Sequence, residues 1–484
     1  MTDDEKPIVR PVRIRLNFIL NALALVLGTA FSWMASTKYA PGSLAAPPFT
    51  SDSAIAVIMS RGPYPSLFSA YYYGQDRFGS LPFLLHALLA RLIGFQASPL
   101  TLYAQLCIVF FLSLIIFLQR AVNSWPAALA AFAIVAVTIS LDRRFVDQIF
   151  ELSKVYPWQL ALLLVALPSV ESGTRLVMAS VFICLATWMN PLSSVFMAVA
   201  VGCCFLVRRG YKGGIPSLIF VVLPAALEAG LRNVYHLVSN HDFGIDYSFP
   251  LEGVMLHPFW DHVHRAWVEV NDAVTLGGLG VSVVAISVGF ARPQGDRSRP
   301  WLLGFCLTGM AVANFFACTL SKYVARNGAF ESRYFSLSRL CVLLAAVLFL
   351  VWAARSLARR TIPMLAVAAT CFGLGLLLLP PDGADTKYSK LQETAMTLVG
   401  HPQPVVVMGS YWETYVYVAL VPDGSLAALP FKSEYDRMPW VARDLFPLAK
   451  TVAVVGAPPS EDFDDRGRRF HRSELRGNVG LYAQ

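Results

Sequence analysis

The stretch 50–83 contains the side chains best suited to acid–base chemistry in this chain. Asp52 and Asp76 are carboxylates, and a carboxylate held near a hydroxyl can take its proton as a general base. Asp52 lies between two serines just before the apolar run AIAVIM, a position that also suits a helix cap. The two roles are compatible, because the start of a helix holds the carboxylate in place. Asp52 is therefore the first candidate for catalysis.

The segment YYYGQDRFGS, residues 71–80, combines the groups that bind a sugar phosphate. Flat tyrosine rings suit the C–H faces of a sugar, amides and acids suit its hydroxyls, and a guanidinium suits a phosphate. Tyr73, Gln75 and Arg77 are the candidates for these contacts. A belt of aromatic side chains against the membrane interface would have a similar composition, so both interpretations stay open.

A second polar segment, LDRRFVDQIFELSK, contains Asp147 and Glu151. These acids are four residues apart, so they share one face if the segment is helical. Either acid could support Asp52 in catalysis or orient an acceptor, and Asp52 and Asp147 are candidate ligands for a divalent cation such as Mg or Mn. The alternative is a solvated connector without a chemical role.

Composition places these segments in a membrane protein. The chain has 484 residues, of which 56% are hydrophobic and 14% charged, with a mean hydropathy of +0.55. A soluble domain has about 25% charged residues. The net charge of +8 is not gathered into a basic run with interleaved aromatics, which excludes a nucleic-acid partner on this evidence. We therefore predict a polytopic protein whose partner is the lipid bilayer.

Long apolar runs predict about eleven membrane-spanning helices, because about 20 apolar residues cross a bilayer. The first run is preceded by arginines but is longer than a signal-peptide core, so we expect a retained helix. The shorter piece 81–95 is expected to lie at the outer interface or against the bundle. The predicted spans are 16–35, 100–119, 126–141, 157–170, 174–189, 192–207, 215–231, 274–291, 300–319, 336–354 and 361–379.

The positions of lysine and arginine predict the orientation, since these residues accumulate in cytoplasmic loops. With a cytoplasmic N-terminus, the short loops near 208–212, 292–299 and 355–360 are internal and rich in cations. We therefore expect a multi-pass protein of the inner membrane with a periplasmic C-terminal domain. The expected outer segments are 36–99, which is the first outer loop, 142–156, 232–273, 320–335 and 380–484.

The outer segment SKYVARNGAFESRYFSLSRL contains cations where this rule does not place them. Lys322, Arg326 and Arg333, with Arg339 beyond them, could bind a phosphate at the outer leaflet, because a guanidinium grips phosphate with two hydrogen bonds. The alternative is pairing with local acids such as Glu331. Within the spans, Glu228 is four residues before Arg232, which predicts an ion pair along one helix.

The tail after residue 379 has a different character. It contains an expected helix at 386–400, an apolar strand in VVVMGS and another in TVAVVGAPP, whereas SYWETYVYVAL suits either a helix or a strand. Strands that alternate with helices predict a small α/β domain. We therefore divide the chain into a membrane domain, 1–379, and a small outer domain, 380–484.

The order of several short motifs resembles the GT-C superfamily of glycosyltransferases. The similarity is greatest to the glycosyltransferase family 39-like bacterial proteins, which include relatives of protein O-mannosyltransferases and of aminoarabinose transferases. The motifs are SDSAIAVIMSRG (51–62), YYGQ (72–75) with GSL (79–81), TWMNP (187–191), ESRYF (331–335) and YW (411–412).

This resemblance implies a GT-C-like helical membrane domain with a small outer domain. It also implies inverting transfer of a sugar from a polyprenyl-phosphate-linked donor to a glycan, lipid or protein acceptor. On this basis Asp52 corresponds to the acid that activates the acceptor, and Arg333 and Tyr334 correspond to the RY motif near the lipid phosphate. Many relatives have two adjacent acids, whereas serines flank Asp52, so Asp76, Asp147 or Glu151 would be its partner.

Two other functions are compatible with the sequence. A transporter or lipid flippase would require polar residues through the middle of the membrane, whereas here they gather on the predicted outer side. A catalytically inactive GT-C-like scaffold would fit the missing adjacent acid. The identities of the sugar and the acceptor do not follow from the sequence.

We predict that Arg333→Ala weakens the use of the lipid-linked donor more than the use of the acceptor. The reason is that the implied contact of Arg333 is with the donor phosphate. Initial rates measured against each substrate in turn would separate the two effects. An equal loss for both substrates would show that Arg333 is structural.

Overall fold

A computed structural model gives the three-dimensional arrangement of the chain. Its N-terminal helical segment is described at residues 28–38. The residues described are 26, 28–62, 70–73, 79–153, 155–173, 175–207, 214–239, 256–292, 298–321, 332–354, 383, 385–399, 405–421, 425–431, 436–438, 440–456, 462–476 and 479–484.

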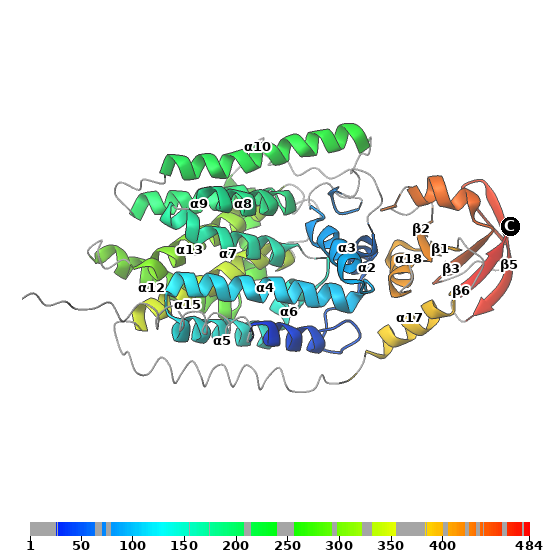
Figure 1. Cartoon of the computed structure of the whole chain (residues 1–484), viewed down its shortest axis with the longest axis horizontal. Helices are drawn as coiled ribbons and strands as arrows, with labels where there is room; N and C mark the ends of the chain where they lie inside the picture. The colour runs from blue at the N-terminus through cyan, green and yellow to red at the C-terminus, as the bar shows by residue number, and fades with distance from the viewer. Residues whose placement is uncertain are drawn as a thin grey trace, which may run out of the picture.

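The membrane part is a bundle of apolar helices that lie side by side (Figure 1). Within the described residues, five helices are long and apolar enough to cross a membrane, namely α4, α10, α12, α13 and α15. The bent pair α5 and α6 would make a sixth span. The bundle helices are α4 (Pro99–Val122), α5 (Trp125–Leu141), α7 (Tyr156–Ser172), α8 (Leu176–Met189), α9 (Leu192–Val207), α10 (Gly214–Ser239), α12 (Ala273–Ala291), α13 (Arg299–Thr319) and α15 (Ser336–Ala354).

The predicted spans from 100 to 354 all coincide with helices. Four of them are shorter than 18 residues: α5, α7, α8 and α9 have 17, 17, 14 and 16 residues. The break between α8 and α9 falls in TWMNP, as its proline predicts. The predicted span 361–379 lies outside the described residues, so the expected total of about eleven spans stays a prediction.

Close helix contacts depend on small residues, as is common where lipid tails provide no hydrophobic driving force between helices. A Cβ on Gly289 of α12 would lie 2.1 Å from the indole nitrogen of Trp301, so only glycine fits there. The buried indole of Trp301 donates a hydrogen bond to the Ala285 carbonyl at 2.8 Å. This contact fixes the packing of α13 against α12.

One end of the bundle gathers the predicted inner loops. The guanidinium of Arg299, at the start of α13, donates to the carboxylate of Glu171 at 2.8 Å. It also donates to the carbonyl oxygens of Arg120 and Pro168 at 3.0 and 2.8 Å. The ends of α4, α7 and α13 therefore meet, as the predicted topology requires. Which side of the membrane this end faces remains a prediction.

The opposite end carries short helices and the C-terminal domain (Figure 1). As expected, 81–95 forms a helix that packs on the bundle, α3, which contacts α2 and α4. Arg143 of α6 ties this end together, because its guanidinium donates to the carbonyls of Ala45 and Ala46 at 2.8 and 2.7 Å. The short elements are α2 (Ser51–Arg61), α3 (Leu81–Ile93), α6 (Arg143–Phe150), α11 (Leu256–Val270) and the 3-10 helix η3 (Ser332–Phe335).

The fully buried Arg339 forms an ion-pair network with partly buried acids at this end. Its guanidinium donates to Asp272 at 2.8 Å, to Asp142 at 2.9 Å and to Gln148 at 3.1 Å. It also lies 4.3 Å above the ring of Phe145. The alternative of pairing with local acids such as Glu331 is therefore wrong for Arg339, because its acidic partners come from distant segments. The predicted pair of Glu228 and Arg232 is confirmed at 2.6 Å.

The C-terminal domain is a mixed six-stranded sheet, ordered β2-β1-β3-β6-β5-β4, with α17 and α18. Strand β1 pairs in parallel with β2 and β3, and the remaining pairs are antiparallel. The expected α/β domain is thus confirmed, and SYWETYVYVAL is helical. The elements are α17 (Thr386–Met396), β1 (Val405–Gly409), α18 (Tyr411–Leu420), β2 (Leu426–Pro430), η4 (Val441–Leu445), η5 (Phe446–Leu448), β3 (Thr451–Val455), β4 (Asp462–Asp465), β5 (Arg468–Arg476) and β6 (Val479–Ala483).

We predict that Arg339→Met destabilises the protein by about 3–5 kcal/mol, because two carboxylates lose their buried partner. Adding Asp142→Asn and Asp272→Asn should recover most of this loss. Both aspartates cap helices through backbone N–H groups, at 2.9 Å for α6 and 2.8 Å for α12, and asparagine caps equally well. Unfolding in detergent measures the effect. A triple variant no more stable than Arg339→Met would contradict the account.

Candidate active site

The helix α2 presents Asp52 at the junction between the bundle and the outer domain. The cap is Thr50, whose hydroxyl accepts from the Ser53 backbone N–H at 3.3 Å, so the expected capping role of Ser51 or Asp52 is wrong. The Ser51 hydroxyl instead donates to the Trp412 carbonyl at 2.6 Å. Because Thr50 caps the helix, the Asp52 carboxylate is available for other contacts.

The outer domain holds one oxygen of the Asp52 carboxylate. The Tyr411 hydroxyl donates to Asp52 Oδ1 at 2.8 Å, and Arg437 Nη2 lies 3.8 Å from the same oxygen. Arg437 Nε donates to the Tyr411 hydroxyl at 3.2 Å, which closes the triangle. Within the described part of the chain, Oδ2 accepts no hydrogen bond, and the side chain is 27% exposed. Asp52 therefore keeps one oxygen open to a ligand.

These two partners come from the same edge of the sheet. Tyr411 follows the carboxyl end of β1, and Arg437 lies in the segment after β2. The carboxyl ends of parallel strands meet at one edge, where α/β folds place their functional groups. Tyr415 fixes the second segment, because its hydroxyl accepts from the Arg437 backbone N–H at 2.8 Å and donates to Asp436 at 3.4 Å.

Burial affects the protonation of the phenols at this site. Burial first, and then the charge of Asp52, raises the pKa of Tyr411, although the nearby Arg437 lowers it in part. Tyr411 is therefore neutral at ordinary pH, and its hydroxyl can donate a hydrogen bond to the Asp52 carboxylate. Burial and Asp52 also raise the pKa of Tyr72, whose hydroxyl donates to the Asp52 backbone carbonyl.

The tyrosine run 71–73 is buried in the protein, with exposures of 0, 2 and 2%, so the lipid-facing belt is wrong for these residues. Tyr71 packs against Tyr235 at 4.6 Å between ring centroids, with the two rings tilted by 54°. Tyr73 packs edge-on against Trp440 at 4.7 Å, and its carbonyl accepts from Arg437 at 3.3 Å. The run therefore connects the bundle, Asp52 and the outer domain.

The turn at Gly79 docks onto the break between α8 and α9. The Gly79 backbone N–H donates to the Trp188 carbonyl at 3.0 Å, and the Trp188 indole donates to the Ala70 carbonyl at 3.0 Å. A Cβ on Gly79 would lie 2.6 Å from the Trp188 carbonyl oxygen, so a side chain does not fit. Two of the motifs that carry the family resemblance are therefore in direct contact.

The two acids of the second outer segment have different surroundings. Asp147 forms an exposed ion pair with Arg143 at 2.9 Å. Glu151 accepts from the Ser153 hydroxyl at 2.6 Å, and its charge, like that of Asp52, acts on Tyr72. The structure therefore pairs Asp147 with Arg143, whereas the pKa of Tyr72 is raised by burial and, to a small extent, by the charge of Glu151.

The divalent cation is not supported by the donors that can be seen. No group of three acids, histidines or cysteines among the described residues is arranged to hold an ion. Asp147 is committed to Arg143, which leaves Asp52 without that proposed co-ligand. We derive no reaction step through a cation.

The other predicted site residues divide into two groups. Tyr334 is buried against α11 and α13, where its carbonyl accepts from the Cys318 thiol at 3.1 Å. Arg333 lies in η3, and the placement of its side chain is outside the described part. The candidates Gln75, Asp76, Arg77, Lys322 and Arg326 also lie outside the described residues.

Arg437 was not a candidate from the sequence, and Tyr411 entered only through the YW motif. Arg437 occurs in the mixed, charge-balanced tail, where one arginine does not stand out. Arg437 can be recognised only from the three-dimensional structure, because the parallel pairing of β1 and β2 is what brings the segment after β2 close to Tyr411.

Comparison with known proteins identifies the fold. No family model and no curated protein matches the sequence. The structure matches that of ArnT from Cupriavidus metallidurans in the apo state, with a TM-score of 0.57, 11% identity and 98% of each chain covered. ArnT bound to undecaprenyl phosphate matches with a TM-score of 0.54, 12% identity and coverage of 97% of this chain and 98% of ArnT.

The chain has the fold of ArnT. The fold that the resemblance implied is thus confirmed, including the C-terminal domain, because the match extends over nearly the whole chain. A weaker similarity, with a TM-score of 0.46 and 13% identity, links the chain to the archaeal oligosaccharyltransferase AglB from Archaeoglobus fulgidus. It covers 90% of this chain and 69% of AglB.

We predict that Tyr411→Phe makes the loss of stability above about pH 10 less steep. An unfolded tyrosine loses its proton near pH 10, whereas folded Tyr411 keeps it to higher pH, so the folded state binds more protons there and stability falls as pH rises. Unfolding midpoints between pH 8 and 11 measure the slope. The exposed neighbour Trp412 provides the control, because Trp412→Phe should keep the original slope. An unchanged slope in Tyr411→Phe would contradict the stated environment.

Proposed function

We propose that this protein is an inverting glycosyltransferase that moves a sugar from a polyprenyl-phosphate donor to an acceptor hydroxyl at the outer face of the inner membrane. The observation that carries the proposal is the Asp52 carboxylate, of which Tyr411 holds one oxygen at 2.8 Å while the other is open. It lies between a membrane bundle and an outer domain, in a fold shared with a protein that binds undecaprenyl phosphate.

In the proposed reaction, Asp52 Oδ2 takes the proton of the acceptor hydroxyl while the acceptor oxygen attacks the anomeric carbon. The bond from that carbon to the phosphate oxygen breaks, and polyprenyl phosphate leaves with the electron pair. A single displacement of this kind inverts the configuration at the anomeric carbon. General-base assistance of this type contributes about 10²–10⁴-fold to the rate.

The leaving phosphate requires positive charge, because negative charge develops on it in the transition state. Arg437 lies close enough to Asp52 to supply such charge, and its position is set by Tyr411, Tyr415 and the Tyr73 carbonyl. Arg333, Arg77, Lys322 and Arg326 remain proposed donor-phosphate contacts from the sequence. No nucleotide-binding motif is needed, since the lipid carries the sugar.

Glu151 is the proposed partner acid of Asp52. Besides burial, the charges of both carboxylates raise the pKa of Tyr72, that of Asp52 more than that of Glu151. On this proposal Glu151 would take the place of the second acid of the family pattern. An active enzyme would then not require an acid adjacent to Asp52, while the acceptor and the sugar remain unassigned.

We predict that Asp52→Asn lowers transfer by at least about 10²-fold without loss of folding. The asparagine side-chain oxygen can still accept from Tyr411, so the domain junction is preserved. Free undecaprenyl phosphate, released from purified protein given undecaprenyl-phosphate sugars, is the readout. The matched control is Asp147→Asn, which removes only an exposed ion pair and should keep nearly full activity.

Three outcomes separate the possible functions. Retained transfer in Asp52→Asn would remove Asp52 from the role of base. Movement of the lipid across the membrane without release of undecaprenyl phosphate would favour a flippase. A folded wild-type protein that does neither, across a panel of donors and acceptors, would favour a scaffold.

A further inference from the structure

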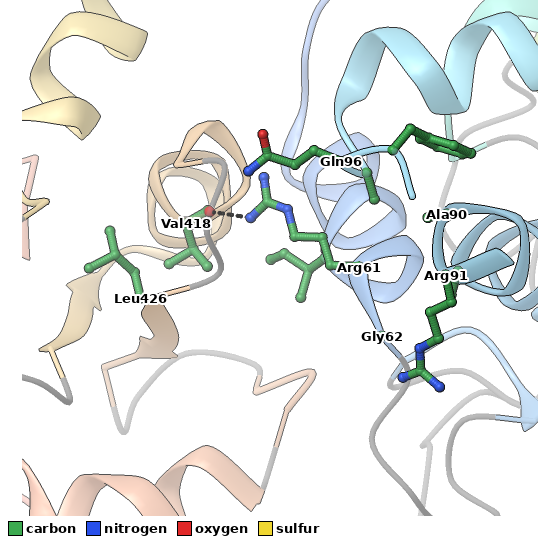
Figure 2. A pocket seen from close by; sticks show the side chains of 11 residues that line it. Arg61, Gly62, Ala90, Arg91, Gln96, Val418 and Leu426 are labelled. Atoms are coloured by element: carbon green, nitrogen blue, oxygen red, sulfur yellow. Dashed lines mark hydrogen bonds between the residues drawn. The ribbon is translucent and has the colours of Figure 1, made fainter. Parts of the chain in front are cut away.

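A cavity lies beside α2, at the end away from Asp52. It has a volume of about 530 Å³ and is lined by the carboxyl end of α2, by α3 and by the outer-domain elements α18 and β2 (Figure 2). Arg61 lies nine positions after Asp52 on α2, which corresponds to about 14 Å along the axis and to the opposite face of the helix. The cavity is therefore separate from the candidate active site.

The lining of this cavity combines positive charge with apolar surface. Arg61 and Arg91 supply two guanidinium groups, and none of the described lining residues is acidic. Ile58, Phe95 and Leu426 contribute apolar surface beside them. Such a lining suits a ligand that has an anionic group joined to an apolar body, because a guanidinium binds phosphate and carboxylate oxygens.

The two arginines have different roles in this wall. Arg61 reaches from α2 to α18, where its guanidinium donates to the Val418 carbonyl at 3.0 Å (Figure 2). It also donates to the Ala419 carbonyl. These bonds hold its charge in a fixed position. Arg91 points away from Arg61 past Gly62 (Figure 2), and in the described part of the chain its guanidinium makes no ion pair or hydrogen bond. Arg91 is thus available to a ligand.

The helix that carries Arg91 also presents apolar side chains to the exterior. Leu88, Leu92 and Ile93 of α3 are 52, 72 and 71% exposed. Exposed leucines next to an arginine are typical of a helix that lies in the membrane interface, where the charged end of the side chain reaches the headgroups. The exposed apolar surface of α3 therefore lies on the same helix as residues that line the cavity.

We propose that this cavity binds the anionic headgroup of a bilayer lipid, with Arg91 on the headgroup, Arg61 as a fixed positive charge in the opposite wall, and the acyl chains along Leu88, Leu92 and Ile93. The bound lipid would join the membrane surface, α3 and the outer domain, because Arg61 already connects α2 to α18. This site does not depend on the proposed glycosyl transfer, since it involves neither Asp52 nor its partners.

The test measures binding of phosphatidylglycerol and phosphatidylcholine to the purified full-length protein in a neutral detergent. We expect the wild-type protein to bind phosphatidylglycerol more tightly than phosphatidylcholine. Arg91→Gln should weaken phosphatidylglycerol binding about five-fold, as expected for one cation near a lipid surface, and Arg91→Lys should restore most of it. Arg91 is chosen because its replacement breaks no described contact, so the variant should fold.

A matched control is Arg469→Gln, which removes the same charge from an exposed position on β5 and should bind phosphatidylglycerol as the wild type does. Equal binding of the two lipids, or unchanged phosphatidylglycerol binding by Arg91→Gln, would overturn the proposal. Competition by millimolar inorganic phosphate that removes the lipid completely would also overturn it, because the ligand would then be a free anion. Glycosyl transfer, measured separately, has no part in these outcomes.

Discussion

The hydrogen bond from Tyr411 to Asp52 joins two groups that are 359 residues apart in the chain. It exists only if the outer domain packs α18 along α2, and this packing is reinforced at both ends of the helix pair. Ser51 donates to the Trp412 carbonyl at one end, and Arg61 donates to the Val418 carbonyl at the other. The geometry of the carboxylate thus depends on the position of a whole domain.

Buried polar groups help to determine that position, together with the apolar core that α2 and α18 share. A membrane bundle has little hydrophobic force to align its helices, so hydrogen bonds and small residues specify the contacts. Arg339 fixes α6 against α12 and α15, and Arg143 of α6 fixes the chain that enters α2. Through these successive contacts the bundle is connected to the Asp52 carboxylate, although Arg339 and Asp52 do not contact each other directly. These contacts account for Arg339, one of the cations that the positive-inside rule did not explain, because it pairs with acids of the protein.

The sequence predicted the parts of the fold that local patterns determine. Apolar runs located the bundle helices, and apolar β-branched runs located β1 and β3, because each pattern reflects burial on its own element. Strand β2, LAALP, lacks β-branched residues, and β5, RRFHRSELR, is highly charged, so neither has a strand signature. Asp52 was found because it precedes the apolar run AIAVIM in a motif that resembles the GT-C first loop, whereas its contact with Arg437 depends on the register of β1 with β2, which no local pattern reveals.

The central claim is that a polyprenyl phosphate binds beside the carboxylate that the two domains share. The most direct measurement is a cryo-electron microscopy map of the full-length protein in lipid nanodiscs with undecaprenyl phosphate. The account predicts phosphate density at the junction of α2 and the outer domain, within contact distance of the group formed by Asp52, Tyr411 and Arg437. Phosphate density at the Arg299 end of the bundle, or none at saturating ligand, would contradict it.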